Sequence, residues 1–300
     1  MEQNYFLNRY KEILGEKQVE KLLKVKLSRF IRVNTIKTSH DKLIRRLEKI
    51  GISLKKVDYL TDGYEVKKAR FSPGAAIEFL LGYYYIQEAA SQCPAQVLNP
   101  KPGEIVLDMA SAPGGKTSQL AQYMNNKGVI IALDTNSGRL KILRDNLERM
   151  GVKNTLVYRK DARFAFDLGV EFDKVLLDAP CSGNFIDDKE WLGKRKPEDI
   201  KNRVRVQREL LKAAIKVLKT GGELVYSTCS MEPEENEFNI NWLLQKYSNL
   251  RLLPLSSLPV SPGLTEVFGK TLNPEIKLCG RFWPHLHNTQ GFFIAHLKKE

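Results

Sequence analysis

Short apolar runs alternate with longer amphipathic segments from Lys101 to the end of the chain. Runs rich in Val, Ile and Leu predict strands that are buried on both faces, and apolar residues at helical spacing predict the helices that cover them. The strand-like runs are EIVLDMA, GVIIALDT, NTLVYRKDA, FDKVLLDAP and ELVYSTCS, and the helix-like segments are KTSQLAQYM, RLKILRDNLERMG, 197–219 and 233–247. This alternation predicts an α/β fold, a doubly wound parallel sheet with helices on both faces, to which LRLLPL and GFFIAHLKK add edge strands.

The part of the chain before Lys101 has a different pattern. Residues 1–27 predict two short amphipathic helices broken near Gly15. The strand FIRVNTIK, the helix HDKLIRRLEKIG and strand-like pieces at 53–57 and 63–66 follow, and together they predict a small α+β module. Residues 82–100 predict a helix that joins this module to the larger unit. The expected division is therefore a first domain at 1–81 and a second at 82–300.

Charge is concentrated in the first module. The chain carries a net charge of +13, and its first 70 residues hold 18 Lys plus Arg against 9 Asp plus Glu. A lopsided basic segment favours a polyanionic partner such as nucleic acid. No basic amphipathic stretch carries the Trp and Phe that a membrane surface would require.

Several classes of protein are disfavoured by composition. The hydrophobic content of 42% is that of a globular protein, and the four cysteines lack the CxxC spacing of a zinc site and the density of a disulfide scaffold. The start MEQNYFLNRYKEILGEK has no apolar secretory core, and no run of about 18 apolar residues occurs. We therefore expect a cytoplasmic protein without a membrane segment or a bound metal.

Polar side chains gather where the expected strands end. In a doubly wound sheet, ligands bind beyond the carboxyl ends of the strands. Five of these ends carry the polar residues Asp108 to Lys116, Asp134, Asp161, Asp178 to Cys181, and Cys229. The sequence thus predicts one site at this edge of the sheet.

The loop DMASAPGGKT within this site has two interpretations. It ends like a phosphate-binding P-loop, but Ala110 stands where that motif requires glycine. A nucleoside cofactor is the better interpretation, because Gly114 and Gly115 allow close backbone approach and Asp134 can accept hydrogen bonds from ribose hydroxyls. Both NAD and S-adenosylmethionine satisfy this geometry, although the lack of GxGxxG disfavours NAD.

Nine segments in order carry a resemblance to a known family. They are RVNT, YIQEAAS, LDMASAPGGKT, ALDTNSGRL, KDAR, LLDAPCSG, QREL, VYSTCS and RFWPHLHNTQGFF. This series, from about Phe30 to Leu297, resembles the Nop/Sun family of RNA cytosine-C5 methyltransferases. The resemblance implies a Rossmann-like methyltransferase sheet, an RRM-like first module and S-adenosylmethionine as cofactor. It also implies the cofactor-binding residues Ala110, Ser111, Ala112, Pro113, Gly114, Gly115, Lys116, Asp134, Arg139, Asp161 and Asp178.

The two cysteines of the site are chemically ambiguous from the residues alone. A thiolate must add to C6 of cytosine before C5 can accept a methyl group, and either Cys181 or Cys229 could reach the base from adjacent strands. Pro180 and Cys181 form the Pro-Cys dipeptide that supplies the nucleophile in DNA cytosine methyltransferases. The resemblance instead implies Cys229 as nucleophile and Cys181 as the residue that assists release of the enzyme. Asp178 is suited to assist at N3.

RNA, and within it tRNA, is the partner that the resemblance implies. A compact chain without appended PUA or rRNA-directed extensions resembles the tRNA-modifying branch, with rRNA as the alternative substrate. We expect a monomer. The expected phosphate contacts are Lys24, Lys26, Arg29 and Arg32 in the first module and Lys194, Arg195 and Lys196 beside the DAPCSG loop.

Three further groups have structural interpretations. His285 and His287 lack a third metal ligand and are expected to be hydrogen-bonded loop residues. Of Tyr83, Tyr84 and Tyr85, at least one is expected in the core. Glu234, Glu235 and Asn236 are expected to form the first turn of a helix after Pro233, where negative charge is favourable.

Overall fold

A nine-stranded mixed sheet forms the centre of the protein, whose computed structural model describes residues 2–300. Five neighbouring strands in the order β9-β8-β5-β6-β7 are parallel, as the alternation of apolar runs predicts. Their bounds are β5 (Ile105–Asp108), β6 (Val129–Asp134), β7 (Thr155–Arg159), β8 (Phe172–Asp178) and β9 (Leu218–Thr228). The doubly wound, Rossmann-like fold expected from the sequence is confirmed.

Antiparallel strands extend the sheet beyond β9. The strand β15 (Phe292–Lys299) pairs with β9 over six residues, and it also pairs with β14 and with β10. The added elements are β10 (Leu250–Leu253), β11 (Ser261–Pro262), β14 (Gly280–Phe282), and the separate ribbon of β12 (Glu266–Val267) and β13 (Lys270–Thr271). LRLLPL thus supplies the edge strand β10, as expected, whereas the expectation of an edge strand is wrong for GFFIAHLKK, because β15 lies between β9 and β14.

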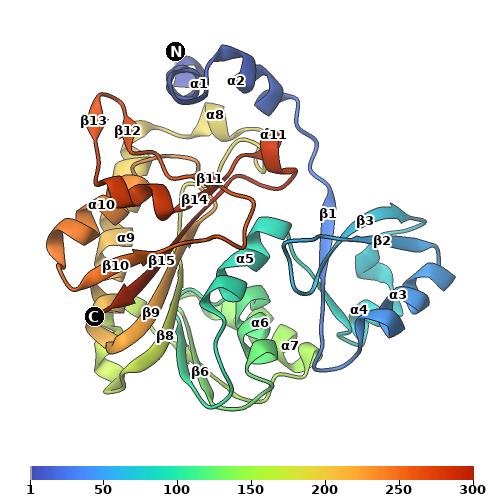
Figure 1. Ribbon diagram of the computed structural model, residues 1–300. Coiled ribbons are helices and arrows are strands. Elements are labelled where there is room, and N and C mark those ends of the chain that lie inside the picture. Colours follow the sequence, from blue (N-terminus) through green and yellow to red (C-terminus); the bar gives the residue numbers. More distant parts are fainter. Residues whose placement is uncertain (1) are drawn as a thin grey trace.

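Helices cover both faces of the central sheet (Figure 1). Alternate residues of β8 divide between the two cores: Leu176 packs with α5 and α6, and Leu177 packs with α9 and α10. Because both faces are covered, β5, β6 and the second half of β8 are almost entirely apolar. The helices are α5 (Ala89–Leu98), α6 (Gly115–Tyr123), α7 (Ser137–Met150), α9 (Pro197–Val217) and α10 (Glu237–Lys246), with the short η2 (Ala162–Leu168), α8 (Trp191–Lys194), η3 (Pro274–Leu278) and α11 (Pro284–His287).

A second, four-stranded antiparallel sheet forms the small module in the order β2-β3-β1-β4. Leu43 and Leu47 of its helix α3 pack on this sheet in a core of their own. The elements are β1 (Arg29–Val33), α3 (His40–Lys49), β2 (Ile52–Lys56), β3 (Gly63–Ala69), η1 (Pro73–Ala75), α4 (Ile77–Leu80) and β4 (Tyr84–Ile86). The expectation of one helix over 82–100 is wrong in its first part, because β4 pairs with β1 and the helix begins only at Ala89. The small sheet therefore extends past the expected boundary at residue 81.

The first two helices, α1 (Glu2–Leu14) and α2 (Glu16–Leu23), pack on the large unit instead of the small sheet. Figure 1 shows them above α8, apart from β1 to β3. The rings of Phe6 and Trp191 meet edge to face with their centroids 4.7 Å apart, and the ring centroids of Tyr10 and Phe185 are 5.4 Å apart. Residues 1–81 are thus split between two packing environments, and Met1 lies outside the described residues.

No helix in the described part of the chain is long and apolar enough to cross a bilayer.

Candidate active site

Two adjoining cavities lie beyond the carboxyl ends of β5, β6 and β8. One of about 280 Å³ and one of about 230 Å³ both have Ala110 in their walls. The first is also lined by Asp134, Arg139 and Asp161, and the second by Ser111, Ala112, Pro113, Gly115, Lys116 and Asp178. All the cofactor-binding residues that the resemblance implies, except Gly114, therefore line one or both of these two cavities.

The loop between β5 and α6 approaches this space with its backbone. Gly114 has a φ of +104°, and a Cβ there would lie 2.9 Å from Leu143 Cδ1, so a larger residue is disfavoured on both counts. Asp108 holds the loop from below, because its Oδ2 accepts a hydrogen bond from Thr117 Oγ1 at 2.7 Å. Burial raises the pKa of Asp108 to about 6. The first amides of α6 remain available to an anionic group.

Two carboxylates at the ends of neighbouring strands are fixed by local hydrogen bonds. Asp134 accepts from Asn136 N at 2.9 Å and lies 3.4 Å from Arg139 Nη1. Asp161 caps η2 and forms an ion pair of 2.6 Å with Arg163, whose hydrogen bonds lower the pKa of Asp161. A carboxylate at each strand end suits the hydroxyl and amino donors of a nucleoside, so the residues present fit such a cofactor.

Asp178 lies in a small polar cluster of the second cavity. Its Oδ2 is 2.7 Å from Lys116 Nζ, and its Oδ1 accepts from Ser227 Oγ at 2.7 Å. Lys116 also donates to Ser91 Oγ at 2.9 Å. Sequence reasoning named Lys116 and Asp178 separately. It missed Ser91 and Ser227, which only the register of β8 with β9 and the position of α5 bring to the site.

Cys181 and Cys229 are in contact. They follow paired residues of β8 and β9, and a hydrogen bond with Cys229, reinforced by burial, raises the pKa of Cys181 well above that of a free thiol. Cys181 is therefore protonated at neutral pH. Both side chains are half-buried, and Asn184 Nδ2 donates to the carbonyl of Cys229 at 2.9 Å. The expected proximity of the two thiols is found.

Glu88 is a further acidic residue in the wall of the second cavity. Burial raises its pKa to about 7, and Ala90 N donates to its carboxylate at 3.1 Å. The sequence offered YIQEAAS only as part of the resemblance, with no chemical role for this residue.

Arg32 corrects the expected set of RNA contacts. Its side chain is fully buried and donates to Gly115 O at 2.6 Å and to Ser118 Oγ at 2.8 Å. Burial lowers the pKa of Arg32 to about 10. Arg32 therefore joins the small sheet to the helix of the cofactor loop, and it is not available to phosphate.

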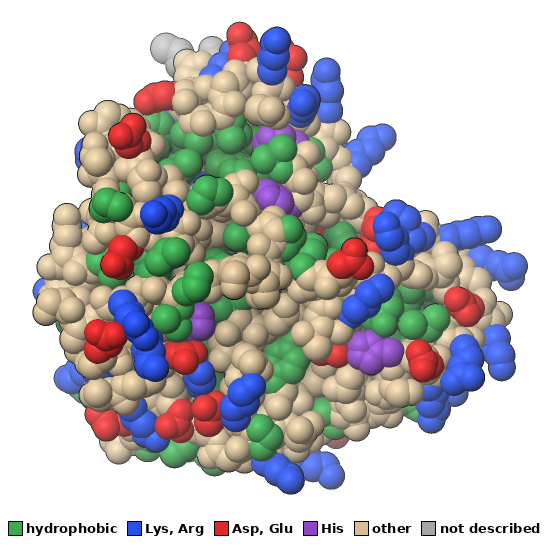
Figure 2. All heavy atoms as spheres, in the orientation of Figure 1, with side chains coloured by type: hydrophobic (Ala, Val, Ile, Leu, Met, Phe, Trp, Pro, Cys, Tyr) green, Lys and Arg blue, Asp and Glu red, His purple; other side chains and the backbone are tan. Residues whose placement is uncertain are grey.

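The other expected phosphate contacts lie at or near the surface. Lys24, Lys26, Arg29, Lys194 and Lys196 are exposed, and Arg195 is half-buried. Lys194 forms an ion pair with Glu190. Figure 2 shows Lys and Arg side chains along the outer rim of the small module and around α2.

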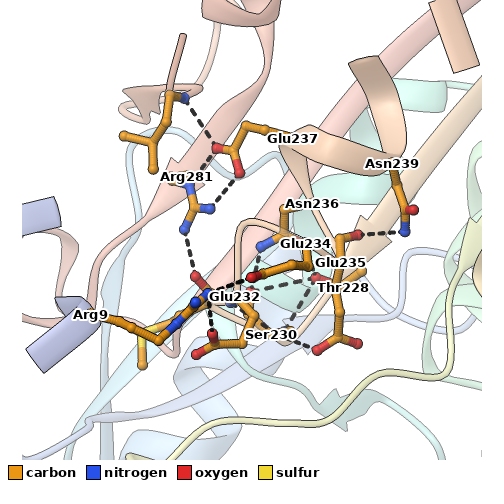
Figure 3. Close-up of polar contacts among 12 residues, drawn as sticks. Arg9, Thr228, Ser230, Glu232, Glu234, Glu235, Asn236, Glu237, Asn239 and Arg281 are labelled. Carbon is orange, nitrogen blue, oxygen red and sulfur yellow. Dashed lines mark hydrogen bonds and ion pairs between the residues drawn. The ribbon is translucent and has the colours of Figure 1, made fainter. Parts of the chain in front are cut away.

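The acidic segment after Cys229 is not the first turn of a helix, because α10 begins only at Glu237. Glu235 and Asn236 are fully buried, and Glu234 forms a 2.6 Å ion pair with Arg9 of α1 (Figure 3). The expected helix dipole role is therefore wrong for these residues. They form a buried hydrogen-bonded segment instead.

The tyrosines and His287 lie largely as expected, whereas the expectation is wrong for His285, whose two ring nitrogens are buried without a hydrogen-bond partner. His287 Nδ1 accepts from Trp283 N at 2.9 Å, and Tyr84 is fully buried whereas Tyr85 lines the second cavity. Among the described residues, no group of three His, Cys, Asp or Glu side chains has the geometry of a metal site.

Two curated relatives show which enzymes the chain is similar to. It is 40% identical to the tRNA (cytosine(49)-C(5))-methyltransferase of Pyrococcus abyssi, over 90% of this chain and 87% of the relative. It is 41% identical to the 28S rRNA (cytosine-C(5))-methyltransferase of Mus musculus, over 90% of this chain but 35% of that protein. The chain thus spans about a third of the mouse protein's length.

Two solved structures of similar proteins also cover nearly the whole chain. A methyltransferase homolog protein from Pyrococcus horikoshii has a TM-score of 0.91 and 46% identity, covering 99% of this chain and 95% of its own. NSun6 from the same organism, solved with SFG, an analogue of S-adenosylmethionine, has a TM-score of 0.84 and 30% identity, covering 98% and 97%.

Two family descriptions account for nearly the whole chain. Residues 3–89 match the N-terminal domain of 16S rRNA methyltransferase RsmF, and residues 95–298 match 16S rRNA methyltransferase RsmB/F. The resemblance to Nop/Sun enzymes is confirmed, and the chain belongs to the RsmB/F family of methyltransferases.

Proposed function

We propose that this protein methylates C5 of cytosine in RNA, with S-adenosylmethionine as the methyl donor and tRNA as the preferred substrate. The observation that carries the proposal is the contact between Cys181 and Cys229, which follow the same two strand ends as the Lys116–Asp178 pair that lines the second cavity. A nucleophilic sulfur with a second thiol beside it is the arrangement that addition of an enzyme sulfur to C6 and its later release require.

The cofactor is assigned to the loop from Ala110 to Lys116, the amides that open α6, and the carboxylates of Asp134 and Asp161. S-adenosylmethionine supplies an electrophilic methyl group when bound. The two curated relatives are both named as cytosine-C5 methyltransferases, and the solved relative with SFG supports the choice of cofactor.

The positions of the side chains support the following mechanism. The sulfur of Cys229 adds to C6 of cytosine, and the electron pair of the C5–C6 double bond moves toward C5 so that C5 becomes nucleophilic. We assign Asp178, which Lys116 and Ser227 hold in place, to N3, where proton donation or hydrogen bonding stabilises the adduct. After methylation the C5 proton passes to water, the C6–S bond breaks, and its electron pair returns to Cys229. Cys181 assists this step because its S–H can hydrogen-bond to the departing sulfur.

RNA is expected to dock on the small module and the rim of the catalytic unit. Lys24, Lys26 and Arg29 are exposed between α2 and β1, where they can contact phosphates. The target base must leave its stack to reach half-buried thiols, so an unpaired or disruptable segment of RNA is the expected target. The tRNA preference is supported by the Pyrococcus abyssi relative, since 87% of that enzyme is covered.

An rRNA substrate is the second candidate, because the mouse rRNA enzyme shares 41% identity with this chain. Both candidates are tested by incubating total cellular RNA with the protein and labelled S-adenosylmethionine, followed by bisulfite sequencing. Label confined to 5-methylcytosine in tRNA supports the proposal, and label confined to rRNA supports the alternative. Label at another base or absence of label contradicts both.

A further inference from the structure

The carboxylate of Glu235 lies between the two loops that carry the cysteines. It is fully buried and accepts hydrogen bonds from Ser182 N at 3.1 Å, from the Ser182 hydroxyl, and from Ser230 Oγ at 2.7 Å. Ser182 follows Cys181 directly, and Ser230 follows Cys229 directly. One side chain therefore holds the residue next to each thiol, and Figure 3 shows its contact with Ser230.

A fourth donor connects the same carboxylate to the other side of Cys181. Gln207 of α9 donates to Glu235 Oε2 at 2.6 Å and to the carbonyl of Pro180 at 3.0 Å. The residues on both sides of Cys181 are thus fixed, directly or through Gln207, to one carboxylate. Neither cysteine loop can shift relative to the other without breaking hydrogen bonds to Glu235.

The backbone of Glu235 is itself held in place. Its carbonyl accepts from Tyr226 OH at 2.6 Å and from Asn239 Nδ2 at 3.1 Å. On either side of it, Arg281 donates to the carbonyl of Met231 at 2.9 Å and pairs with Glu237 at 2.5 Å. The carboxylate is therefore a fixed point and not a mobile side chain.

We propose that Glu235 is a positioning residue, which sets the distance and orientation between Cys181 and Cys229. The consequence for catalysis rests on the proposed function, whereas the effect on the two thiols does not. Glu235 touches neither substrate nor cofactor, and it acts on the cysteine loops through Ser182, Ser230 and Gln207 and on Cys181 through its charge.

The chemistry of the four donors allows the hydrogen bonds of Glu235 to be tested separately from its negative charge. Oε2 meets two N–H donors, which cannot act as acceptors, whereas Oε1 meets two hydroxyls, which can. Glutamine can therefore retain all four contacts, with its oxygen at the Oε2 position and its amide donating to the two serines. Alanine loses them all. In addition, the negative charge of Glu235 is one of the causes that raise the pKa of Cys181.

The first test is kinetic, with Glu235→Ala and Glu235→Gln in the full-length chain. We expect kcat for RNA methylation to fall by about 100-fold in Glu235→Ala, since displacement of a reacting group by about 1 Å has an effect of that order. KM for S-adenosylmethionine should be unchanged, and Glu235→Gln should retain kcat to within roughly fivefold because its hydrogen bonds are retained. Glu78→Ala is the matched control: it removes another buried carboxylate, in the small module, that contacts Arg46 and neither cysteine loop.

The second test does not depend on methyl transfer. The rate of iodoacetamide alkylation at Cys181 is measured against pH in a Cys229→Ser background, with and without Glu235→Gln. Loss of the negative charge should move the alkylation midpoint of Cys181 to lower pH, and Glu78→Ala should leave it unchanged.

The outcomes separate this inference from the proposed function. A folded Glu235→Ala protein with kcat within about threefold of wild type, or a loss of kcat well beyond fivefold in Glu235→Gln, overturns the positioning role. An unmoved alkylation midpoint in Glu235→Gln overturns the effect of the Glu235 charge on Cys181. If the wild-type protein methylates no RNA, the proposed function fails, and the alkylation shift still decides whether Glu235 controls the thiols. If Glu235→Ala does not fold, the Glu235→Gln measurements remain decisive.

Discussion

Removal of the Glu237 carboxylate should destabilise the protein more than removal of an exposed one. Glu237 and Arg281 are almost completely buried, with side-chain exposures of 0% and 2%, and their ion pair is 2.5 Å long. Glu237 also accepts from Leu264 N at 3.1 Å. In Glu237→Gln the charge of Arg281 stays buried without a counter-charge, and breaking a buried pair in this way costs about 3–5 kcal/mol.

That free energy corresponds to a clear shift in thermal unfolding. At about 2–4 °C per kcal/mol for a domain approaching this size, Tm should fall by roughly 6–20 °C. The control is Glu300→Gln, which breaks an ion pair with Arg251 whose side chains are 57% and 53% exposed. Such exposed pairs contribute less than about 1 kcal/mol.

Urea unfolding, followed by circular dichroism, measures both variants. Unfolding midpoints at constant slope give the difference in the free energy of unfolding. A loss below about 1 kcal/mol for Glu237→Gln, equal to that of Glu300→Gln, would refute the claim that the segment after Cys229 is held by a buried charge pair.

Two other predictions concern the exposed basic residues near α2 and the buried carboxyl group of Glu232. Charge reversal at Lys24, Lys26 and Arg29 should weaken RNA binding and reduce its salt dependence, while the affinity for the cofactor is unchanged. Arg32→Met, in contrast, should disturb the cofactor loop. Filter binding measures the RNA affinity and calorimetry the cofactor affinity, so the two outcomes can be distinguished. Unchanged RNA affinity in the charge-reversed variant would contradict the docking site. Burial raises the pKa of Glu232 to about 7, so the folded state favours the protonated acid. The stability from Glu232 is thus present at low pH and is lost as pH rises through about 7, and between about pH 5 and pH 8 wild type should lose stability relative to Glu232→Gln. Parallel pH profiles of the two proteins would contradict this assignment.

The central sheet and its site were predictable because they depend on local patterns. Uninterrupted apolar runs identify strands that are covered on both faces, and in a parallel sheet the ends of such strands meet at one edge. The contact between Cys181 and Cys229 follows from that rule, since each cysteine comes shortly after one of two neighbouring strands.

The errors arose where long-range packing overrides a local pattern. Arg32 has the composition of a surface cation, and only the docking of β1 against α6 buries it. Glu235 follows a proline in an acidic cluster, a pattern equally typical of the first turn of a helix. Its actual partners, Ser182 and Gln207, lie 53 and 28 residues away in sequence. The three residues of β4 were too short a run to separate from the helix that follows.

The division of roles between the two cysteines is the central claim, and covalent trapping tests it most directly. Single variants Cys229→Ala and Cys181→Ala are incubated with RNA and S-adenosylmethionine and then analysed on a denaturing gel. The account predicts that Cys229→Ala abolishes both methylation and adduct formation, whereas Cys181→Ala accumulates a covalent protein–RNA complex because release is impaired. A denaturation-resistant complex formed by Cys229→Ala, and not by Cys181→Ala, would reverse the two roles and contradict the account.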